Sequence, residues 1–455
     1  MSNVAVRRPL ASVLWILSHV DDVLFALAYG VWASIRHPEQ PIYQKLVQLL
    51  ASPEDPGWRA RVLPRGGKYV VASDHHLLYS GAPHDYFSGH GRGVAFRNEG
   101  MYAAVMARYG AGGFTLVENG DVEDLVVTEP THDGTKCLLS GAAGRLVFEA
   151  DAGLRRSMRL HRLWRVTRSY MGYYRHLLGV FGPDRIVKLV GNHDVELLRP
   201  EFAEVVPLKV PIHEFAVIPA GPDGPAIVIC HGHQMDPWTC TRTAAGIGES
   251  ITESAAWLGQ GADRIWLRSD WEPPLSHDNQ PACAPWIAPG RLFPPKFRHM
   301  GERRLLKRLG KTFSADDRPW LVLGHTHEPR YRSADRYVNG GAVGRYQDLL
   351  WLVEIEAGRP QLVAWWVDPA GALVRAVLVE APGDRLVAAN PTVQGPLPPT
   401  PYAERPPLPE IDAQIPDVLP PTPWRWLVAR AAFHAVFYAV ALSLVWAACR
   451  WFVSR

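Results

Sequence analysis

Five short apolar runs that each end in polar residues of one chemical kind constrain this chain more than any other feature. Each run between residues 68 and 327 stops at Asp, Asn or His, and helical stretches separate the runs. Short apolar runs that alternate with helical patterns predict an α/β fold. The runs and their endings are Lys68–His76, Phe114–Asp121, Ile186–Asp194, Ala226–His233 and Trp320–His327.

The polar endings predict a shared metal site. Ligands gather at the carboxyl ends of strands in α/β sheets, so these five ends are expected to converge. Asp, Asn and His without thiolate suit Mn, Fe or Zn, and they outnumber the ligands of one ion, so two divalent ions are expected. Each run alone has a simpler explanation, because a His after a strand can be structural and Gly191–Asp194 can form an ordinary turn. The five together are better explained by a site.

These motifs resemble the signature of the calcineurin-like metallophosphoesterases, D-x-H, G-D, G-N-H-[DE], H and G-H-x-H, over roughly residues 68–350. The resemblance implies an α/β fold built as a layered β-sandwich flanked by helices. It also implies hydrolysis of a phosphomonoester, phosphodiester or pyrophosphate by a hydroxide shared between two metals. By this resemblance the ligands are Asp74, His76 and His327 for one ion, Asn192, His231 and His325 for the other, and Asp121 as the bridge.

The same resemblance gives catalytic roles to two further residues. His193 would face the scissile phosphate and donate a proton to the leaving oxygen, and Asp124 would orient His193. Elementary chemistry agrees with Asp121 as the bridge, because a carboxylate has an oxygen for each ion whereas an imidazole offers a metal one lone pair. His75 is expected to point away from the site if strand alternation persists, so it is left out, as is His233.

Departures from the signature narrow the expected substrate. Protein serine/threonine phosphatases of this family have Arg-Gly and usually Glu where this chain has Leu125-Val126 and Asp194, which disfavours that branch. The motif order, with an insertion at 236–300, is more similar to the UDP-diacylglucosamine pyrophosphatases. Aromatic residues in this insertion form either an apolar cap over the metals or part of the core. They are Trp238, Trp257, Trp266, Trp271 and Trp286.

A second insertion, residues 140–180, contains a basic helical stretch. Residues 152–183 include seven Arg and no Asp or Glu, and five of the Arg share one helical face. This face suits an anionic substrate or anionic lipid headgroups, or else it is an ordinary solvated surface. We predict that three of these residues bind the substrate, namely Arg155, Arg159 and Arg162.

The C-terminal region predicts a membrane anchor. Residues Ala431–Cys449 contain no Asp, Glu, Lys or Arg, and at about 1.5 Å per residue they span roughly 28 Å, close to a bilayer core. We predict a transmembrane helix over 424–452, with a buried core helix as the alternative. Residues 386–423 are rich in proline and predict a semi-rigid linker rather than a ligand for a proline-binding partner.

The N-terminal region, 1–60, predicts an amphipathic helical segment, with a cleaved signal peptide as the alternative. Asp21 and Asp22 interrupt its apolar stretch, which disfavours a spanning helix. The catalytic domain is then expected over 61–385. Without a cleaved signal the catalytic domain would lie in the cytoplasm, and five cysteines without a C-x-x-C pair fit a reducing compartment.

The expected function is therefore that of a membrane-anchored phosphoesterase with two divalent metals, acting on a lipid-linked or nucleotide substrate. The formal net charge of +3 gives no reason to expect a nucleic-acid partner. The alternative is a non-catalytic membrane-tethered scaffold that retains the fold. A complete ligand set favours the enzyme, because a retired enzyme is expected to lose ligands.

Overall fold

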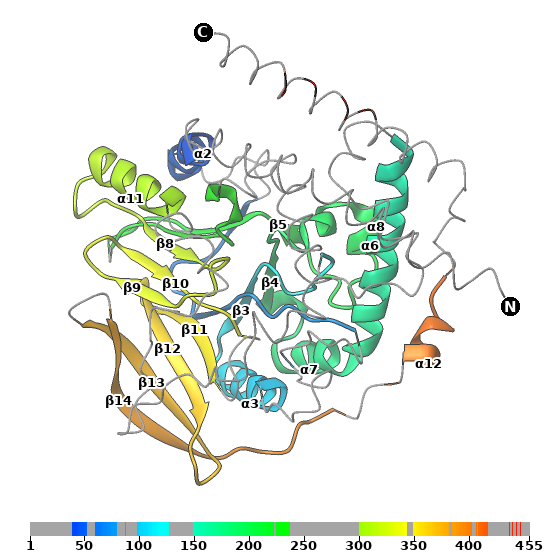
Figure 1. Cartoon of the computed structure of the whole chain (residues 1–455). Helices are drawn as coiled ribbons and strands as arrows, with labels where there is room; N and C mark the ends of the chain where they lie inside the picture. Colours follow the sequence, from blue (N-terminus) through cyan, green and yellow to red (C-terminus); the bar gives the residue numbers. More distant parts are fainter. Residues whose placement is uncertain are drawn as a thin grey trace, which may run out of the picture.

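The molecule is built around two β-sheets that face one another (Figure 1). The structure, a computed structural model, describes residues 39–51, 60–79, 87, 98–126, 149–222, 224–236, 300–343, 349–381, 385–402, 406 and 408–416, with 436, 439, 443 and 446. Within these residues both sheets mix parallel and antiparallel pairs, and helices cover their outer faces.

The smaller sheet has six strands in the order β1-β6-β7-β8-β10-β9. These are β1 (Ala60–Val62), β6 (Phe215–Ile218), β7 (Ile227–Ile229), β8 (Trp320–Leu323), β9 (Arg330–Arg332) and β10 (Tyr337–Asn339). The larger sheet has eight strands in the order β14-β13-β12-β11-β2-β3-β4-β5. These are β2 (Tyr69–Ala72), β3 (Thr115–Asn119), β4 (Ile186–Leu189), β5 (Ile212–His213), β11 (Leu349–Glu356), β12 (Arg359–Val367), β13 (Ala372–Ala381) and β14 (Arg385–Pro396).

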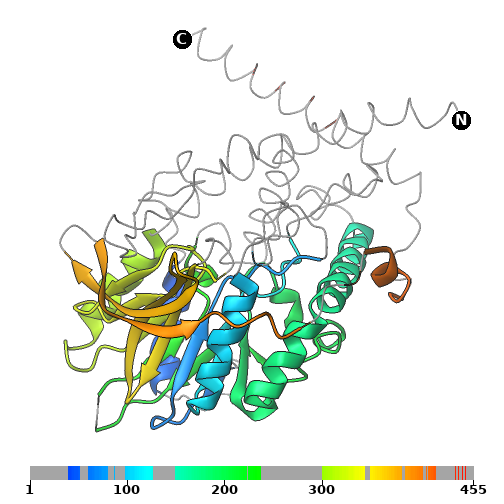
Figure 2. The same ribbon diagram turned by 90° about the horizontal axis from the view of Figure 1, so that it is seen from below.

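The helices form two outer layers (Figure 2). The longer helices are α2 (Glu39–Ala51), α3 (Asn98–Ala111), α6 (Glu149–Ser169), α7 (Met171–Phe181) and α11 (Met300–Thr312). Shorter helical pieces are η3 (Pro183–Arg185), η4 (Val195–Leu198), α8 (Pro200–Ala203), η5 (His233–Met235) and α12 (Leu408–Asp412). Helices α3 and α7 pack against each other on the larger sheet, and α2 packs against α11 on the smaller one.

Strand alternation explains why the chain forms layers. In β2, Val71 faces the core between the sheets, whereas Val70 and Ala72 face the core beneath α3, α6 and α7. In β7, Ile229 faces the larger sheet, and Val228 faces α2 and α11. Because both faces of these central strands are buried, the runs read as continuous apolar stretches. The expected layered β-sandwich flanked by helices is present.

A buried charge network lies between the larger sheet and α7. The Lys188 ammonium is 2.9 Å from carboxylate oxygens of both Glu118 and Glu123, and all three side chains are fully buried. The Tyr173 and Tyr174 hydroxyls donate to Glu118 and Glu123, each at 2.8 Å. Buried charges are tolerated only when they are paired and hydrogen-bonded in this way.

The proline-rich region differs from the expected linker. Strand β14 occupies Arg385–Pro396, so the folded body continues beyond residue 385, and Leu397 and Tyr402 then pack on the core under α3 and α7. Helix α12 follows, with Ile411 fully buried. Pro391 and Pro396 are tolerated because β14 is the edge strand of its sheet and a proline there removes no necessary ladder bond. We define the strap as residues 397–402 together with 408–416.

Other expectations concern parts of the chain outside the described residues. Most of the predicted transmembrane helix at 424–452 and most of the insertion at 236–300 belong to them, as does the chain before residue 39. Among the described residues, no helix has the length and apolar character needed to cross a bilayer. Helix α2, in the predicted N-terminal segment, buries Ile42, Leu46 and Leu49 against the smaller sheet.

Candidate metal centre

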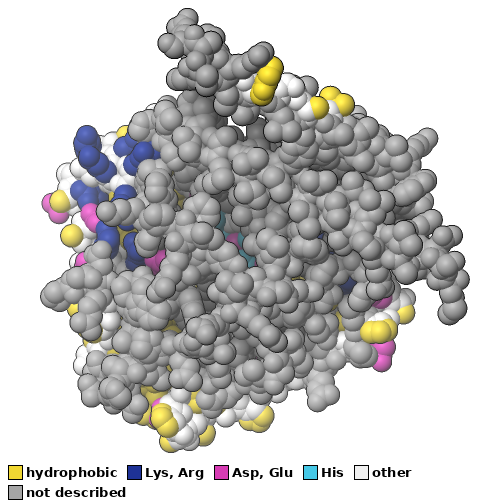
Figure 3. Space-filling model, in the orientation of Figure 1, with side chains coloured by type: hydrophobic (Ala, Val, Ile, Leu, Met, Phe, Trp, Pro, Cys, Tyr) yellow, Lys and Arg dark blue, Asp and Glu magenta, His cyan; other side chains and the backbone are white. Residues whose placement is uncertain are grey.

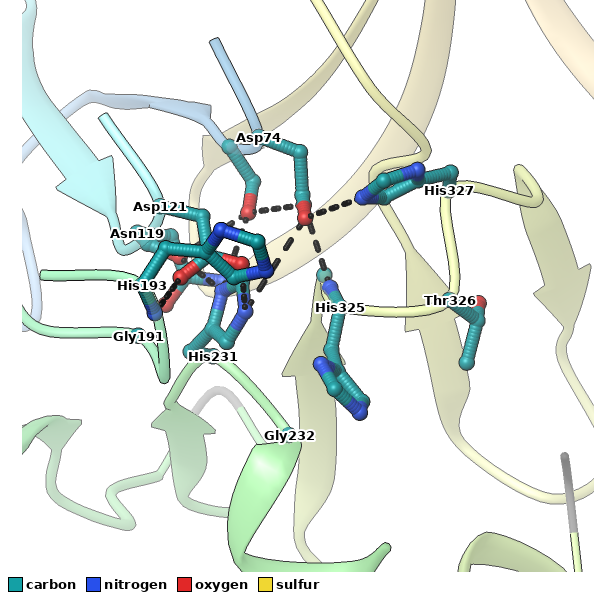
Figure 4. A network of polar contacts seen from close by, with 12 residues as sticks. Asp74, Asn119, Asp121, Gly191, His193, His231, Gly232, His325, Thr326 and His327 are labelled. Atoms are coloured by element: carbon teal, nitrogen blue, oxygen red, sulfur yellow. Dashed lines mark hydrogen bonds and ion pairs between the residues drawn. The ribbon is translucent and has the colours of Figure 1, made fainter. Parts of the chain in front are cut away.

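The expected ligands come from loops that directly follow strands of both sheets. Asp74, Asp121, His231 and His325 lie two residues after β2, β3, β7 and β8, and Asn192 lies three residues after β4. Because the carboxyl ends of these strands face the same side of the sandwich, side chains as far apart in the sequence as Asp74 and His327 meet (Figure 4). Main-chain hydrogen bonds join the loops, from Asp74 N to Gly120 O at 3.1 Å and from Gly324 N to His231 O at 2.8 Å.

Five of the expected ligands have left-handed backbone conformations, with φ between 48° and 66°. They are Asp74, His76, Asp121, His325 and His327. This conformation costs an L-residue roughly 1–2 kcal/mol, so the fold pays for turning these side chains toward one another. Strain of this kind persists where surrounding contacts determine the backbone, and it is concentrated at functional sites.

The first group of ligands is Asp74, His76 and His327. The His327 Nε2 atom is 3.1 Å from Asp74 Oδ1 and 3.0 Å from His76 Nε2. His76 Nδ1 is 2.8 Å from Asp124 Oδ2, so Nδ1 donates to Asp124 and the lone pair of His76 is on Nε2. One donor atom from each residue lies within 4.8 Å of the others, an arrangement that can hold a cation.

The second group is Asp121, His231 and His325, which also has donor atoms within 4.8 Å of one another. His231 Nε2 is 3.1 Å from Asp121 Oδ2 and 3.9 Å from Asp74 Oδ1. Asp121 Oδ2 is also 4.0 Å from His76 Nε2 of the first group. Asp121 therefore lies between the two groups.

Buried polar atoms support a fit to cations. Among the described residues, Asp74 Oδ1, Asn192 Oδ1 and His231 Nε2 are buried and form no hydrogen bond, although Asp74 Oδ1 and His231 Nε2 each have a neighbour of opposite kind at 3.1 Å. Such atoms are costly unless they are paired, and here they are oxygen and imidazole donors, as Mn, Fe or Zn requires. The donor set thus fits divalent metal ions. The Asn192 Oδ1 atom belongs to neither of the two groups described above.

Neighbouring histidines keep the buried carboxylates ionised. Burial alone would raise the pKa of Asp74 and Asp121, but His231 beside both, with His327 at Asp74 and His193 at Asp121, lowers the pKa of each below its ordinary value. Backbone amides also donate hydrogen bonds to both carboxylates. His325 N donates to Asp74 Oδ2 at 3.0 Å, and His193 N donates to Asp121 Oδ1 at 2.8 Å.

A hydrogen bond to Asp124 holds His193, which is the arrangement that the motif resemblance implies. His193 Nδ1 is 2.9 Å from Asp124 Oδ1, and the same carboxylate holds His76 through its other oxygen. Burial alone would lower the pKa of His193, but the charges of Asp124 and Asp121 raise it to about 10. In the metal-free protein the imidazole therefore holds a proton at neutral pH, and its Nδ1 is engaged by Asp124.

Glycines allow the loops to approach. Gly120 has φ of +79°, a conformation that glycine adopts without strain. An added Cβ on Gly191 would overlap the Asp121 carboxylate. The G-D and G-N-H motifs therefore place small residues where two site loops touch.

Asp236 is a site residue that the sequence analysis did not identify. Its Oδ2 is 2.9 Å from His325 Nε2, which leaves Nδ1 of His325 as the donor toward a cation. Asp236 follows η5, five residues after His231, but no spacing rule connects it with His325, 89 positions away. The only sequence signal for Asp236 was its position shortly after His231, at the start of the insertion at 236–300.

Three further supporting residues were not identified either. Ser73 donates to Asp74 Oδ2 at 2.5 Å, and His231 Nδ1 donates to the Asn119 carbonyl at 2.8 Å. Asp194 accepts from Gly191 N at 2.6 Å and from Val122 N at 2.9 Å, which ties the β4 loop to the β3 loop. Each lies within two positions of an expected ligand, so position relative to the motifs was the available signal.

The two histidines left out of the site have distinct surroundings. His75 is fully buried against the rings of Tyr102 and Phe87, at centroid distances of 4.9 and 5.7 Å, on the α3 side of the sheet. His233 is buried in η5, 5.6 Å from the His231 ring. Neither belongs to a metal-ligand group among the described residues.

The arginines predicted to bind substrate have other contacts. The backbone of Arg155 lies in α6, and its side chain is outside the description. Arg159 is buried and forms an ion pair with Glu196 at 2.7 Å, and Arg162 donates to the Leu125 carbonyl at 2.7 Å. Arg165 pairs with Asp412 of the strap through two hydrogen bonds of 2.7 Å. The shared basic face of α6 thus fastens loops and strap to the body.

Comparisons with known proteins give few matches. A scan against protein-family models finds no match, and a search of curated proteins also finds none. Among solved structures, a cold-active protein-tyrosine phosphatase of a Shewanella species is 13% identical, with a TM-score of 0.25 and coverage of 67% of this chain and 79% of that one.

Two other solved structures are similar at the same level. A protein described as a 5'-nucleotidase from Staphylococcus aureus is 12% identical, with a TM-score of 0.28 and coverage of 76% of this chain and 57% of that one. The calcineurin-like phosphoesterase YfkN from Bacillus subtilis is 10% identical, with a TM-score of 0.25 and coverage of 72% and 90%. With TM-scores this low, none of the three establishes a family for the chain.

Proposed function

We propose that this protein is a metallophosphoesterase that hydrolyses a phosphomonoester, phosphodiester or pyrophosphate with two divalent ions. One observation carries the proposal: Asp74–His76–His327 and Asp121–His231–His325 form two adjacent groups of donors, with Asp121 between them. Two adjacent cations would activate water and neutralise the phosphoryl oxygens. The motif resemblance to the calcineurin-like family supports the same assignment.

The chain's own residues supply the remaining chemistry. Asp74, His76 and His327 would hold one ion, and Asn192, His231 and His325 the other, with Asp121 shared. His193 stands beside Asp121 and is protonated through Asp124, so it would donate its Nε2 proton to the leaving oxygen. The buried carboxylates are fixed by backbone amides before substrate arrives, so little reorganisation is needed during the reaction.

Membrane attachment through residues 424–452 stays a prediction from the sequence, and so does the substrate, lipid-linked or nucleotide. The contacts of Arg159 and Arg162 favour a structural role, so we do not include them among substrate-binding groups. Donor chemistry limits the metal to Mn, Fe or Zn and does not select one of the three.

Metal content and turnover together test the proposal. Purified full-length protein, loaded with Mn, is assayed with bis-(p-nitrophenyl) phosphate and p-nitrophenyl phosphate, and bound metal is counted by elemental analysis. We expect two ions per chain and turnover that falls at least 100-fold in His193→Ala with metal retained, because a general acid contributes roughly 10²–10⁴-fold. Asp121→Asn should lose both metal and turnover. Equal background turnover in all three proteins would favour the non-catalytic scaffold.

A further inference from the structure

Helix α11 presents a basic face that the proposed chemistry does not use. Arg303, Lys307 and Lys311 are exposed and lie four residues apart, so they form one row along the helix. At about 1.5 Å per residue this row is roughly 12 Å long. Arg304 and Arg308 flank it and are half-buried. We call the five cations of this helix the α11 basic face.

No acidic residue of α11 balances this face. The only carboxylate in the helix, Glu302, is buried and accepts the Tyr337 hydroxyl hydrogen bond at 2.9 Å. Like charges four residues apart destabilise a helix by about 0.2–0.5 kcal/mol per pair. The opposite face, with Leu305 and Leu309, is fully buried against the smaller sheet. The helix is therefore fixed by packing, and it keeps Arg303, Lys307 and Lys311 exposed at a cost to its own stability, whereas Arg308 donates to Gln40 and lies over the Tyr43 ring.

The α11 basic face lies on the same side of the molecule as the metal centre. Figure 3 shows a group of Lys and Arg side chains over α11 and histidine side chains near the middle of the same face. Helix α11 also packs on η5, the helical turn that follows His231. An added Cβ on Gly301, in the first turn of α11, would overlap the Met235 carbonyl. The basic face is thus rigidly connected to a ligand loop.

We propose that the α11 basic face docks on an anionic lipid bilayer and so holds the metal centre close to the membrane surface. An exposed row of cations can contact several anionic headgroups of a membrane surface at once. The described aromatic ring beside the face, Tyr43, is covered by the Arg308 guanidinium 5.4 Å from its centroid, so it is a poor platform for stacking on the bases of single-stranded nucleic acid. The apolar run Ala431–Cys449 independently suits a chain that works at a membrane. The docking proposal does not depend on catalysis.

Vesicle binding by full-length protein tests the docking proposal. The test variant carries Arg303→Gln, Lys307→Gln and Lys311→Gln. The matched control removes three exposed cations elsewhere, Arg61→Gln, Lys68→Gln and Arg359→Gln. Each protein is sedimented with vesicles of phosphatidylcholine alone and of phosphatidylcholine mixed with phosphatidylglycerol, and circular dichroism checks that each is folded.

We expect the α11 variant to lose on the order of 100-fold in partitioning to phosphatidylglycerol vesicles, at about fivefold per cation, and the control to lose little. Raising the salt from about 0.1 M should weaken wild-type binding in the same way. Equal partitioning of variant and control, or a variant that loses oligonucleotide binding and keeps vesicle binding, would overturn the proposal. Turnover of a soluble phosphodiester should be the same in all three proteins, so a failed catalytic proposal is seen separately.

Discussion

At the scale of single residues, the site depends on backbone conformations that side chains disfavour. Five expected ligands have positive φ, and the loops that carry them approach closely at Gly120 and Gly191. These positions tolerate little change, because the surrounding contacts that fix the strained backbone are themselves tight. Substitutions here are expected to disturb ligand geometry before they unfold the chain.

Gly191→Ala tests this close approach. The added Cβ would overlap the Asp121 carboxylate, so we expect Asp121 to move, manganese affinity to fall at least tenfold, and stability to fall by about 1–3 kcal/mol. Gly179→Ala in α7 is the control, since nothing lies within 4 Å of its added Cβ. It should stabilise the helix by roughly 0.5–1 kcal/mol. Titration calorimetry and urea unfolding measure both effects, and unchanged metal binding in Gly191→Ala would count against the assignment of Asp121.

His193 makes the stability of the metal-free protein depend on pH. Its pKa in the folded state, about 10, exceeds the ordinary value of about 6.5, so the protonated imidazole stabilises the fold. This contribution is complete below about pH 6.5 and is lost as the pH rises through about 10. Urea unfolding of chelator-treated protein between these limits measures it. In Asp124→Asn the loss should be much smaller, and an identical slope in both proteins would contradict the pairing.

Asp236 is expected to position His325. Asp236→Asn should reduce the affinity for the more weakly held ion by about 10–100-fold, as is typical when the carboxylate behind a ligating histidine is removed. Competition with a chelator measures affinity without turnover. Asp236→Glu should restore part of the affinity, and Asp335→Asn, at an exposed carboxylate elsewhere, is the control. Full metal affinity in Asp236→Asn would remove this role.

At the scale of elements, helix α6 shows how a surface pattern can mislead. Helical spacing predicts five arginines on one face, but spacing does not reveal what covers that face. Here Glu196, the Leu125 carbonyl and Asp412 come from distant segments and satisfy Arg159, Arg162 and Arg165. Three arginines of the predicted anion-binding face therefore make internal contacts, and the substrate-binding role of the face stays a prediction.

Arg159→Ala distinguishes the two roles of this face. Replacing Arg159 is expected to lower the free energy of unfolding by roughly 1–3 kcal/mol, because Glu196 loses its buried partner and keeps only the half-exposed Arg199. Substrate binding should change little. Urea unfolding and the KM for a phosphodiester are measured together, with the half-exposed Arg199→Ala as a milder control. A tenfold rise in KM with unchanged stability would restore the substrate-binding interpretation.

The strand ends and their ligand chemistry could be predicted from the sequence because they depend on local patterns. Asp74, Asp121 and His231 follow apolar runs, and such runs indicate buried strands wherever they pair. The distribution of these strands over two sheets could not be predicted, since β2 pairs with β11 across about 280 positions. Asp236 could not be predicted for the same reason. The proline content predicted a linker where the structure has strand β14, because an edge strand tolerates prolines that a central strand excludes.

At the scale of the whole molecule, the strap closes the outer helical layer. Leu397 and Tyr402 pack on the core beneath α3 and α7, Ile411 is fully buried, and Asp412 pairs with Arg165. The folded body therefore includes residues well beyond the predicted boundary at 385.

Truncation measures what the strap contributes. A chain that ends after residue 416 keeps the whole strap and serves as the reference. Ending it after 396 should cost about 3–5 kcal/mol, at roughly 1.5–3 kcal/mol for each buried apolar side chain less the share that is only partly buried. Thermal unfolding of the two proteins provides the comparison. Equal melting temperatures would mean that the strap adds no stability.

The pairing of β2 with β11 also has a consequence for synthesis. Val71 is aligned with Val353, and the loop after β2 carries Asp74 and His76. A ribosome that has translated only the first four motifs has therefore made a chain whose first ligand strand lacks one neighbour. The nascent protein is expected to acquire cations only after β11 has left the exit tunnel, so the centre would mature in one late step rather than motif by motif.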